Sequence, residues 1–128
     1  MMKRYKALVV DDAEMFQKIY KSILLADGFK VFIANNGAEA LKSVMEDKPD
    51  IMLLDINMPI MDGYKVLEHV KSNDDLASIP ILVLSSRGQP EEIEKAMDLG
   101  ADGYLIKTTS KPKEVVAKIK EVLERQEE

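Results

Sequence analysis

Acidic, hydroxyl and lysine side chains follow directly on four short apolar runs of this sequence. The residues at these positions are Asp11, Asp12, Asp55, Ser85 and Lys107. A carboxylate at the mouth of a hydrophobic segment loses hydration, so its presence there needs a functional or structural reason. Taken singly, each of these residues could instead be an ordinary turn acid, helix cap or solvated lysine.

The residue types point to one kind of chemistry if they lie together. Three carboxylates repel one another unless a cation lies among them, and hard oxygen ligands with room for water suit Mg²⁺. A metal alone would not explain Lys107 and Ser85, which could bind a tetrahedral oxyanion through a point charge and a hydrogen bond. Asp55 is the best candidate for nucleophile, because a carboxylate can attack phosphorus to give an aspartyl phosphate. The set therefore indicates Mg²⁺-assisted phosphoryl transfer to Asp55.

The elements that must position these residues follow from the hydrophobic spacing. Short apolar runs alternate with segments whose apolar residues recur at helical intervals. Strands are expected at residues 5–10, 31–33, 51–54, 81–84 and 103–106. Helices are expected at residues 15–26, 36–47, 63–72, 90–99 and 112–123. Five strands alternating with five helices predict an α/β fold with a doubly wound parallel sheet and helices on both faces.

Two of the expected helices carry specific predictions about packing. The helix at 15–26 should bury one stripe that includes Met15 and Phe16, and the helix at 36–47 should turn Met45 inward. The helix at 90–99 has the thinnest apolar face and should be the loosest on the core, although Met97 belongs to that face.

The parallel sheet also gathers the polar residues. Its strands all end at one edge, and ligands of such sheets bind beyond that edge. The acids at 11, 12 and 55, the serine at 85 and the lysine at 107 would therefore share one rim, although they are distant in sequence. Such a coincidence is improbable if every one of them has only a local structural role.

Length and composition narrow the possible classes of protein. A chain of 128 residues with 46% hydrophobic and 32% charged residues is expected to form one globular domain spanning 1–128. The absence of cysteine excludes disulfides, thiolate zinc sites and thiol catalysis. A net charge of −5 argues against direct nucleic-acid binding. No apolar run is long enough for a signal sequence or a membrane span, so we expect a cytoplasmic protein without a membrane partner.

Together the motifs resemble the receiver domain of two-component response regulators, and in particular the single-domain chemotaxis regulators. The residues that carry the resemblance are Asp11-Asp12, the segment Asp-Ile-Asn-Met-Pro-Ile-Met-Asp-Gly at 55–63, Ser85, and Tyr-Leu-Ile-Lys at 104–107. The resemblance covers about residues 4–125, which is nearly the whole chain. It implies a flavodoxin-like (βα)5 sheet ordered 2-1-3-4-5, with Asp55 accepting a phosphoryl group from a histidine kinase or a histidine phosphotransfer protein.

The resemblance also implies a role for each residue around Asp55. Asp12 and Asp55 would bind Mg²⁺ through their side chains, Asn57 through its backbone carbonyl, and Asp11 through water. Lys107 would pair first with Asp55 and then with the phosphoryl group.

Further implied roles concern the response to phosphorylation. Ser85 would shift toward the phosphate and Tyr104 would turn inward behind it. This change would alter the face made by the fourth helix, the fifth strand and the fifth helix, where a downstream effector protein would bind. Asn57 and Arg87 would flank the path of the attacking water and tune how long the phosphate lasts.

One position departs from the usual pattern of the family. Lys107 is followed by Thr108, where a proline in a cis peptide is usual. A non-proline cis bond costs about 2.5–4 kcal/mol, which favours a trans peptide and a differently shaped loop here.

Two other functions compete with the phosphorylation switch. A constitutive receiver-like scaffold would require the loss of at least one site residue, and none is missing. An aspartate-nucleophile phosphatase usually needs a second acid two residues after the nucleophile, and that position holds Asn57. We therefore expect self-phosphotransfer and autodephosphorylation rather than an enzyme with a separate diffusible substrate.

Overall fold

The computed structural model describes residues 4–127. Its centre is a five-stranded parallel sheet with the strand order β2-β1-β3-β4-β5. The strands are β1 (Lys6–Val10), β2 (Lys30–Ala34), β3 (Ile51–Leu54), β4 (Ile81–Ser85) and β5 (Gly103–Ile106). This order confirms the predicted doubly wound, flavodoxin-like sheet.

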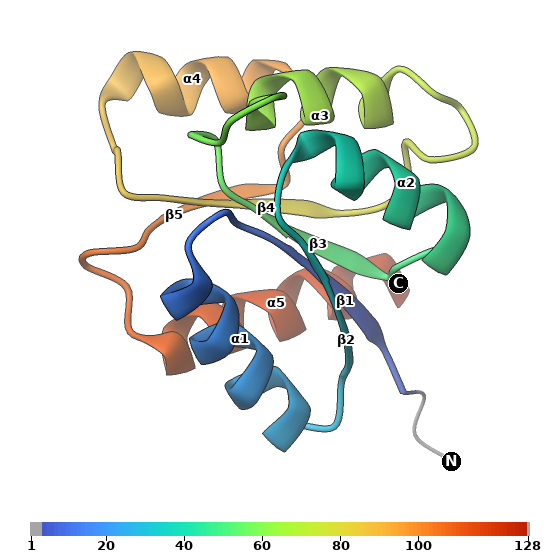
Figure 1. The fold of residues 1–128 in the computed structure, drawn as a ribbon, viewed down its shortest axis with the longest axis vertical. Helices are drawn as coiled ribbons and strands as arrows, with labels where there is room; N and C mark the ends of the chain where they lie inside the picture. Colours follow the sequence, from blue (N-terminus) through green and yellow to red (C-terminus); the bar gives the residue numbers. More distant parts are fainter. Residues whose placement is uncertain (1–3, 128) are drawn as a thin grey trace.

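Five helices cover the two faces of this sheet (Figure 1). They are α1 (Glu14–Ala26), α2 (Gly37–Asp47), α3 (Gly63–Lys71), α4 (Pro90–Asp98) and α5 (Pro112–Glu127). Alternate residues of each strand point to opposite faces. In β1, Leu8 and Val10 therefore pack with α2, α3 and α4, whereas Ala7 and Val9 pack with α1 and α5. Of the helices described, none combines the length and apolar character needed to cross a bilayer.

Local sequence explains where the helices next to the site begin. The side chain of Asn36 accepts a hydrogen bond from the backbone N–H of Glu39 at 2.9 Å and so caps α2. Asp62 caps α3 in the same way, through the N–H of Lys65 at 3.0 Å. Pro90 occupies the first turn of α4, where a missing N–H does no harm.

The structure confirms the predicted elements but corrects part of the predicted packing. Met15, Met45 and Met97 are exposed to 62%, 60% and 44%, so they lie outside the buried stripes assigned to them. The apolar face of a helix is wider than the part of the helix that contacts the core, and these methionines lie outside the contact. The helix predicted to have the thinnest apolar face, α4, contains one fully buried residue, Ala96.

The path of the chain separates its two ends from the carboxyl edge of the sheet. Every strand runs in the same direction, and α5 returns across the sheet toward the edge where β1 begins. In Figure 1 the described chain therefore starts and finishes on the right, whereas the strands end on the left.

Candidate functional site

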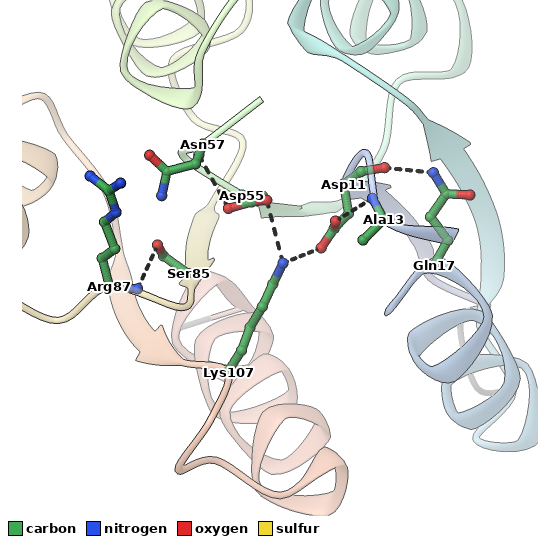
Figure 2. Close-up of polar contacts among 8 residues, drawn as sticks. All are labelled: Asp11, Ala13, Gln17, Asp55, Asn57, Ser85, Arg87 and Lys107. Carbon is green, nitrogen blue, oxygen red and sulfur yellow. Dashed lines mark hydrogen bonds and ion pairs between the residues drawn. The ribbon is translucent and has the colours of Figure 1, made fainter. Parts of the chain in front are cut away.

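The predicted site residues do meet at the carboxyl edge of the sheet (Figure 2). Asp11 follows β1, Asp55 follows β3, Ser85 ends β4 and Lys107 follows β5. Within the described part of the chain, the buried polar and charged residues are Asp11, Asp55 and Ser85, with exposed fractions of 3%, 6% and 0%. All three belong to this edge, so the fold concentrates its buried polarity in one place.

Lys107 lies between the two buried acids. Its Nζ is 2.5 Å from Asp11 Oδ2 and 3.4 Å from Asp55 Oδ2, and 5% of its side chain is exposed. The backbone N–H of Lys107 donates to the carbonyl of Ser85 at 2.8 Å and so fixes the start of this side chain against β4. A buried charge is tolerated only when it is paired, and here each charge is paired by the other sign.

The sheet holds both acids by their backbones. The N–H of Asp55 donates to the carbonyl of Val10 at 3.0 Å, and the N–H of Asp11 donates to that of Ala34 at 3.1 Å. The Asp55 carboxylate also accepts from the backbone N–H of Asn57 at 3.2 Å. The two acids are therefore held in place before any ligand binds.

Burial raises the pKa of Asp55 above its ordinary value. The ammonium of Lys107 opposes this shift, and the negative charge of Asp11 adds to it. A second positive charge beside Asp55 would therefore favour its ionised form.

The acids of this site fit a divalent cation. Asp11, Asp12 and Asp55 each offer a carboxylate oxygen, and these oxygens all lie within 4.8 Å of one another. Asp12 is exposed, so this side of the group faces water. A set of only oxygen ligands with access to water matches the preference of Mg²⁺.

The predicted switch residues share one hydrogen-bonded loop. The hydroxyl oxygen of Ser85 accepts from the backbone N–H of Arg87 at 3.1 Å, and the hydroxyl of Tyr104 donates to the carbonyl of Arg87 at 2.6 Å. Tyr104 is half-buried and packs against the core cluster on the α4 side of the sheet. Its burial raises the pKa of the phenol. Arg87 thus links Ser85 to Tyr104 through its own backbone.

The two residues predicted to tune the phosphate lifetime lie on the other side of Asp55 from Lys107. Figure 2 shows the side chains of Asn57 and Arg87 on this side. Their position relative to Asp55 is therefore known, whereas their effect on the phosphate lifetime stays a prediction.

The loop after Asp55 must pass very close to the next helix. A Cβ added at Gly63 would lie 2.5 Å from the carbonyl oxygen of Asp55 and 2.7 Å from the Cα of Ile56. The N–H of Gly63 donates to the carbonyl of Ile56 at 2.9 Å. Only glycine allows this close approach. The contact holds the backbone of Asp55 and Ile56 in place.

The loop after β5 follows the expectation from backbone energetics. The described chain contains no cis peptide, so the Lys107–Thr108 bond is trans. The loop closes as a turn in which the N–H of Ser110 donates to the carbonyl of Ile106 at 2.9 Å.

Two residues that contact the site, Phe16 and Gln17, were not predicted as site residues from the sequence. The Nζ of Lys107 lies 4.2 Å from the ring centroid of Phe16, and Gln17 Nε2 donates to the carbonyl of Asp11 at 2.5 Å. Gln17 also donates to Asn35 Oδ1 at 2.7 Å. The sequence signal that could have identified them is their position in the first turn of α1, which begins shortly after Asp11.

Comparison with known proteins agrees with this geometry. Residues 7–120 match the response regulator receiver domain family. The probable transcriptional regulator ycf27 of Guillardia theta is 38% identical over 120 residues, which are 94% of this chain and 46% of that protein. The transcriptional regulatory protein PrrA of Mycobacterium tuberculosis is 38% identical over 121 residues, which are 94% of this chain and 50% of that protein. The chain thus spans about half the length of these curated relatives.

Solved structures share the whole fold. A CheY-like response regulator receiver domain protein from Methanospirillum hungatei has a TM-score of 0.90 and 28% identity and covers 98% of both chains. The chemotaxis protein CheY4 of Vibrio cholerae has a TM-score of 0.87 and 28% identity, over 94% of this chain and 99% of its own. With the family match over residues 7–120, these likenesses show that the chain belongs to the response regulator receiver domain family.

Proposed function

We propose that this chain is a phosphorylation-activated switch in which Asp55 accepts a phosphoryl group from a phosphohistidine donor. The observation that carries the proposal is the position of Lys107, whose buried Nζ lies between Asp11 and Asp55. An ammonium held at that point can pair with the Asp55 carboxylate first and with the negatively charged phosphoryl group after the transfer. Membership of the receiver family supports a histidine kinase or histidine phosphotransfer protein as the donor.

The proposed step is a single phosphoryl transfer. A carboxylate oxygen of Asp55 forms a bond to phosphorus while the bond from phosphorus to the donor imidazole nitrogen breaks, and that nitrogen keeps the electron pair. Lys107 neutralises charge that develops on a phosphoryl oxygen. The oxygen of the Ser85 hydroxyl accepts from the N–H of Arg87, and the same hydroxyl could donate its hydrogen to a second phosphoryl oxygen.

Mg²⁺ is the proposed cofactor of this transfer. The side chains of Asp12 and Asp55 and the carbonyl of Asn57 would hold it, with Asp11 acting through water. When bound, the ion supplies positive charge that stabilises the transferring oxygens. When Lys107 turns toward the phosphoryl group, the acids lose its positive charge. Bound Mg²⁺ would then offset the repulsion between them.

The change at Asp55 would reach the surface through the loop that joins β4 to α4. Ser85, Arg87 and Tyr104 form a continuous set of hydrogen bonds from the site to β5. A shift of Ser85 toward the phosphate would therefore disturb the bond from Tyr104. The proposed output is altered binding at the α4-β5-α5 face by an effector, which would be another protein or a further segment of a longer chain.

Asn57, two residues after Asp55, argues against a phosphatase with a diffusible substrate. Asn57 cannot protonate a leaving group as an acid at this position would. A constitutive scaffold would not need Lys107 to lie buried between two acids. Receiver family membership favours a signalling switch over either alternative.

The test is the intact mass of the protein after incubation with acetyl phosphate, with and without Mg²⁺. The wild type should gain one phosphoryl group only when Mg²⁺ is present, and Asp55→Asn should gain none. Asp98→Asn, which changes an exposed aspartate on α4, is the matched control and should behave as the wild type.

Two results would overturn parts of the proposal. Equal phosphorylation of Asp55→Asn would exclude Asp55 as the acceptor. If neither acetyl phosphate nor a phosphohistidine protein modifies the wild type, the constitutive scaffold becomes the better explanation.

A further inference from the structure

We infer that Phe16 is a positioning residue for Lys107, which its ring holds between the two buried acids. The Nζ of Lys107 lies 4.2 Å from the centroid of the Phe16 ring, within the range of a cation–π interaction. The effect on phosphoryl transfer that follows rests on the function proposed above for Asp55, whereas the position of Lys107 does not.

The ring completes the surroundings of the ammonium group. Lys107 has three N–H donors, and the carboxylates of Asp11 and Asp55 lie 2.5 Å and 3.4 Å from its nitrogen. The Phe16 ring lies against the same nitrogen, and 5% of the lysine side chain is exposed. Cation–π attraction is strongest where water is excluded, so the ring contributes most at a site such as this one.

The ring itself is held in place by its neighbours. Phe16 stacks on Tyr20 with centroids 6.2 Å apart and an interplanar angle of 12°, and Tyr20 is buried. Phe16 also packs against the core cluster between the sheet and the α1-α5 layer. A ring fixed in this way provides a stationary surface on which the ammonium can rest.

A ring face suits a lysine that must change partners. A hydrogen bond to Asp11 or Asp55 requires one N–H to point at the acceptor, whereas the ring face attracts the whole charge and does not require a particular N–H to point at it. As Lys107 turns from a carboxylate to a phosphoryl oxygen, Phe16 would keep its nitrogen at the same depth. Without the ring, the strongest remaining attraction is the closer acid, Asp11, which is not the proposed phosphoryl acceptor.

Phosphorylation rates can separate this role from simple core packing. At saturating acetyl phosphate and Mg²⁺, Phe16→Leu should slow the gain of a phosphoryl group about threefold to tenfold, and Phe16→Tyr should stay within about twofold of the wild type. Phe29→Leu is the matched control, because Phe29 is buried in the same core cluster but precedes β2 at the opposite edge of the sheet. It should leave the rate unchanged.

A spectroscopic measurement tests the geometry without any phosphoryl donor. The ring current of Phe16 should move the Cε protons of Lys107 upfield in the NMR spectrum of the wild type. This shift should persist in Phe16→Tyr and Phe29→Leu and disappear in Phe16→Leu. If Phe16→Leu destabilises the fold, the wild-type shift and the Phe16→Tyr variant still decide the question.

The two measurements distinguish failure of this inference from failure of the proposed function. A wild type without the upfield shift, or a folded Phe16→Leu variant with the wild-type rate, would overturn the role of Phe16. A wild type that shows the shift but accepts phosphate neither from acetyl phosphate nor from a phosphohistidine protein would retain the position of the ring and exclude the transfer to Asp55.

Discussion

Asp55 occupies a position that disfavours its own charge. Its burial and the nearby Asp11 raise its pKa, and Lys107 compensates only in part. The raised pKa means that the folded protein binds a proton at Asp55 more tightly than the unfolded chain does. Ionised Asp55 therefore reduces stability, and this loss appears as the pH rises from the ordinary pKa of 3.8 through the higher pKa of the folded state.

Replacing this carboxylate should stabilise the fold. Without divalent cations at neutral pH, Asp55→Asn should raise the free energy of unfolding by about 1–2 kcal/mol, because it removes a buried charge and its repulsion with Asp11. The advantage should vanish as the pH falls below 3.8, where both states protonate Asp55 in the wild type. Urea unfolding at a series of pH values measures it. A variant less stable than the wild type at neutral pH would show that the Lys107 pairing outweighs burial.

The contrast between Phe16 and Lys107 shows which residues of the site the sequence could identify. Asp55 and Lys107 were found because each follows an apolar run, and parallel strands end at one edge. Phe16 was assigned to a buried helical stripe, which agrees with its packing but says nothing about the lysine above it. Spacing gives the face of a helix, whereas the residue opposite that face depends on the angle at which the helix packs.

At the scale of elements, α4 is held largely by groups at its edges. Ala96 is its one fully buried residue, and the hydroxyl of Tyr64 donates to the carbonyl of Glu92 at 3.3 Å. The centroid of the Tyr64 ring also lies 4.2 Å from the Nζ of Lys95. The loop before α4 is held by Tyr104 through the carbonyl of Arg87. Few buried contacts and localised hydrogen bonds are the features of a segment that opens independently of the whole fold.

Removal of one tyrosine hydroxyl should therefore loosen α4 alone. Tyr104→Phe should increase amide hydrogen exchange in residues 89–99, while the global free energy of unfolding falls by no more than about 1 kcal/mol. Tyr20→Phe on α1, across the sheet, is the control and should leave exchange in α4 unchanged. Equal acceleration in every helix would contradict a local effect.

The start of α3 is constrained in a different way. Gly63→Ala should destabilise the protein by about 2–3 kcal/mol, because the added Cβ would meet the Asp55 carbonyl and the Ile56 backbone, neither of which can move freely. It should also slow phosphorylation by displacing Asp55. Gly28→Ala is the comparison, since nothing lies within 4 Å of its added Cβ and only its φ of +90° opposes the change, at about 1 kcal/mol. Thermal unfolding measures the stability of both variants. Equal losses of stability in Gly63→Ala and Gly28→Ala would argue against the clash at Gly63.

The elements themselves were predictable because each carries its own pattern. Strands such as β3 are continuous apolar runs, and Asn36 with Glu39 marks the start of α2. The outward position of Met45 was not predictable, because a methionine at the border of an apolar stripe can lie on either side of the contact. The hydrogen bonds that join Tyr104 and Ser85 to the backbone of Arg87 could not be predicted from the sequence either, because they depend on how the loop after β4 folds.

For the molecule as a whole, ligand binding at the acidic edge should add to stability. Mg²⁺ that binds only the folded state should raise the midpoint of thermal unfolding, and at a concentration 100 times Kd the gain is about 2.7 kcal/mol. Asp12→Asn should reduce this gain, because it removes one of the three carboxylates of the site. Calorimetry over a Mg²⁺ series measures it. A wild type that shows no shift at saturating Mg²⁺ would exclude the cation site.

The direction in which the chain enters and leaves the sheet also determines how the protein can be handled. Both ends of the described chain lie at the edge opposite Asp55. A fluorescent label, an affinity tag or a surface attached at either end would therefore face away from an approaching phosphodonor. Tethered protein should present its acidic edge to solution, which makes immobilised capture a practical way to measure how fast each candidate kinase engages it.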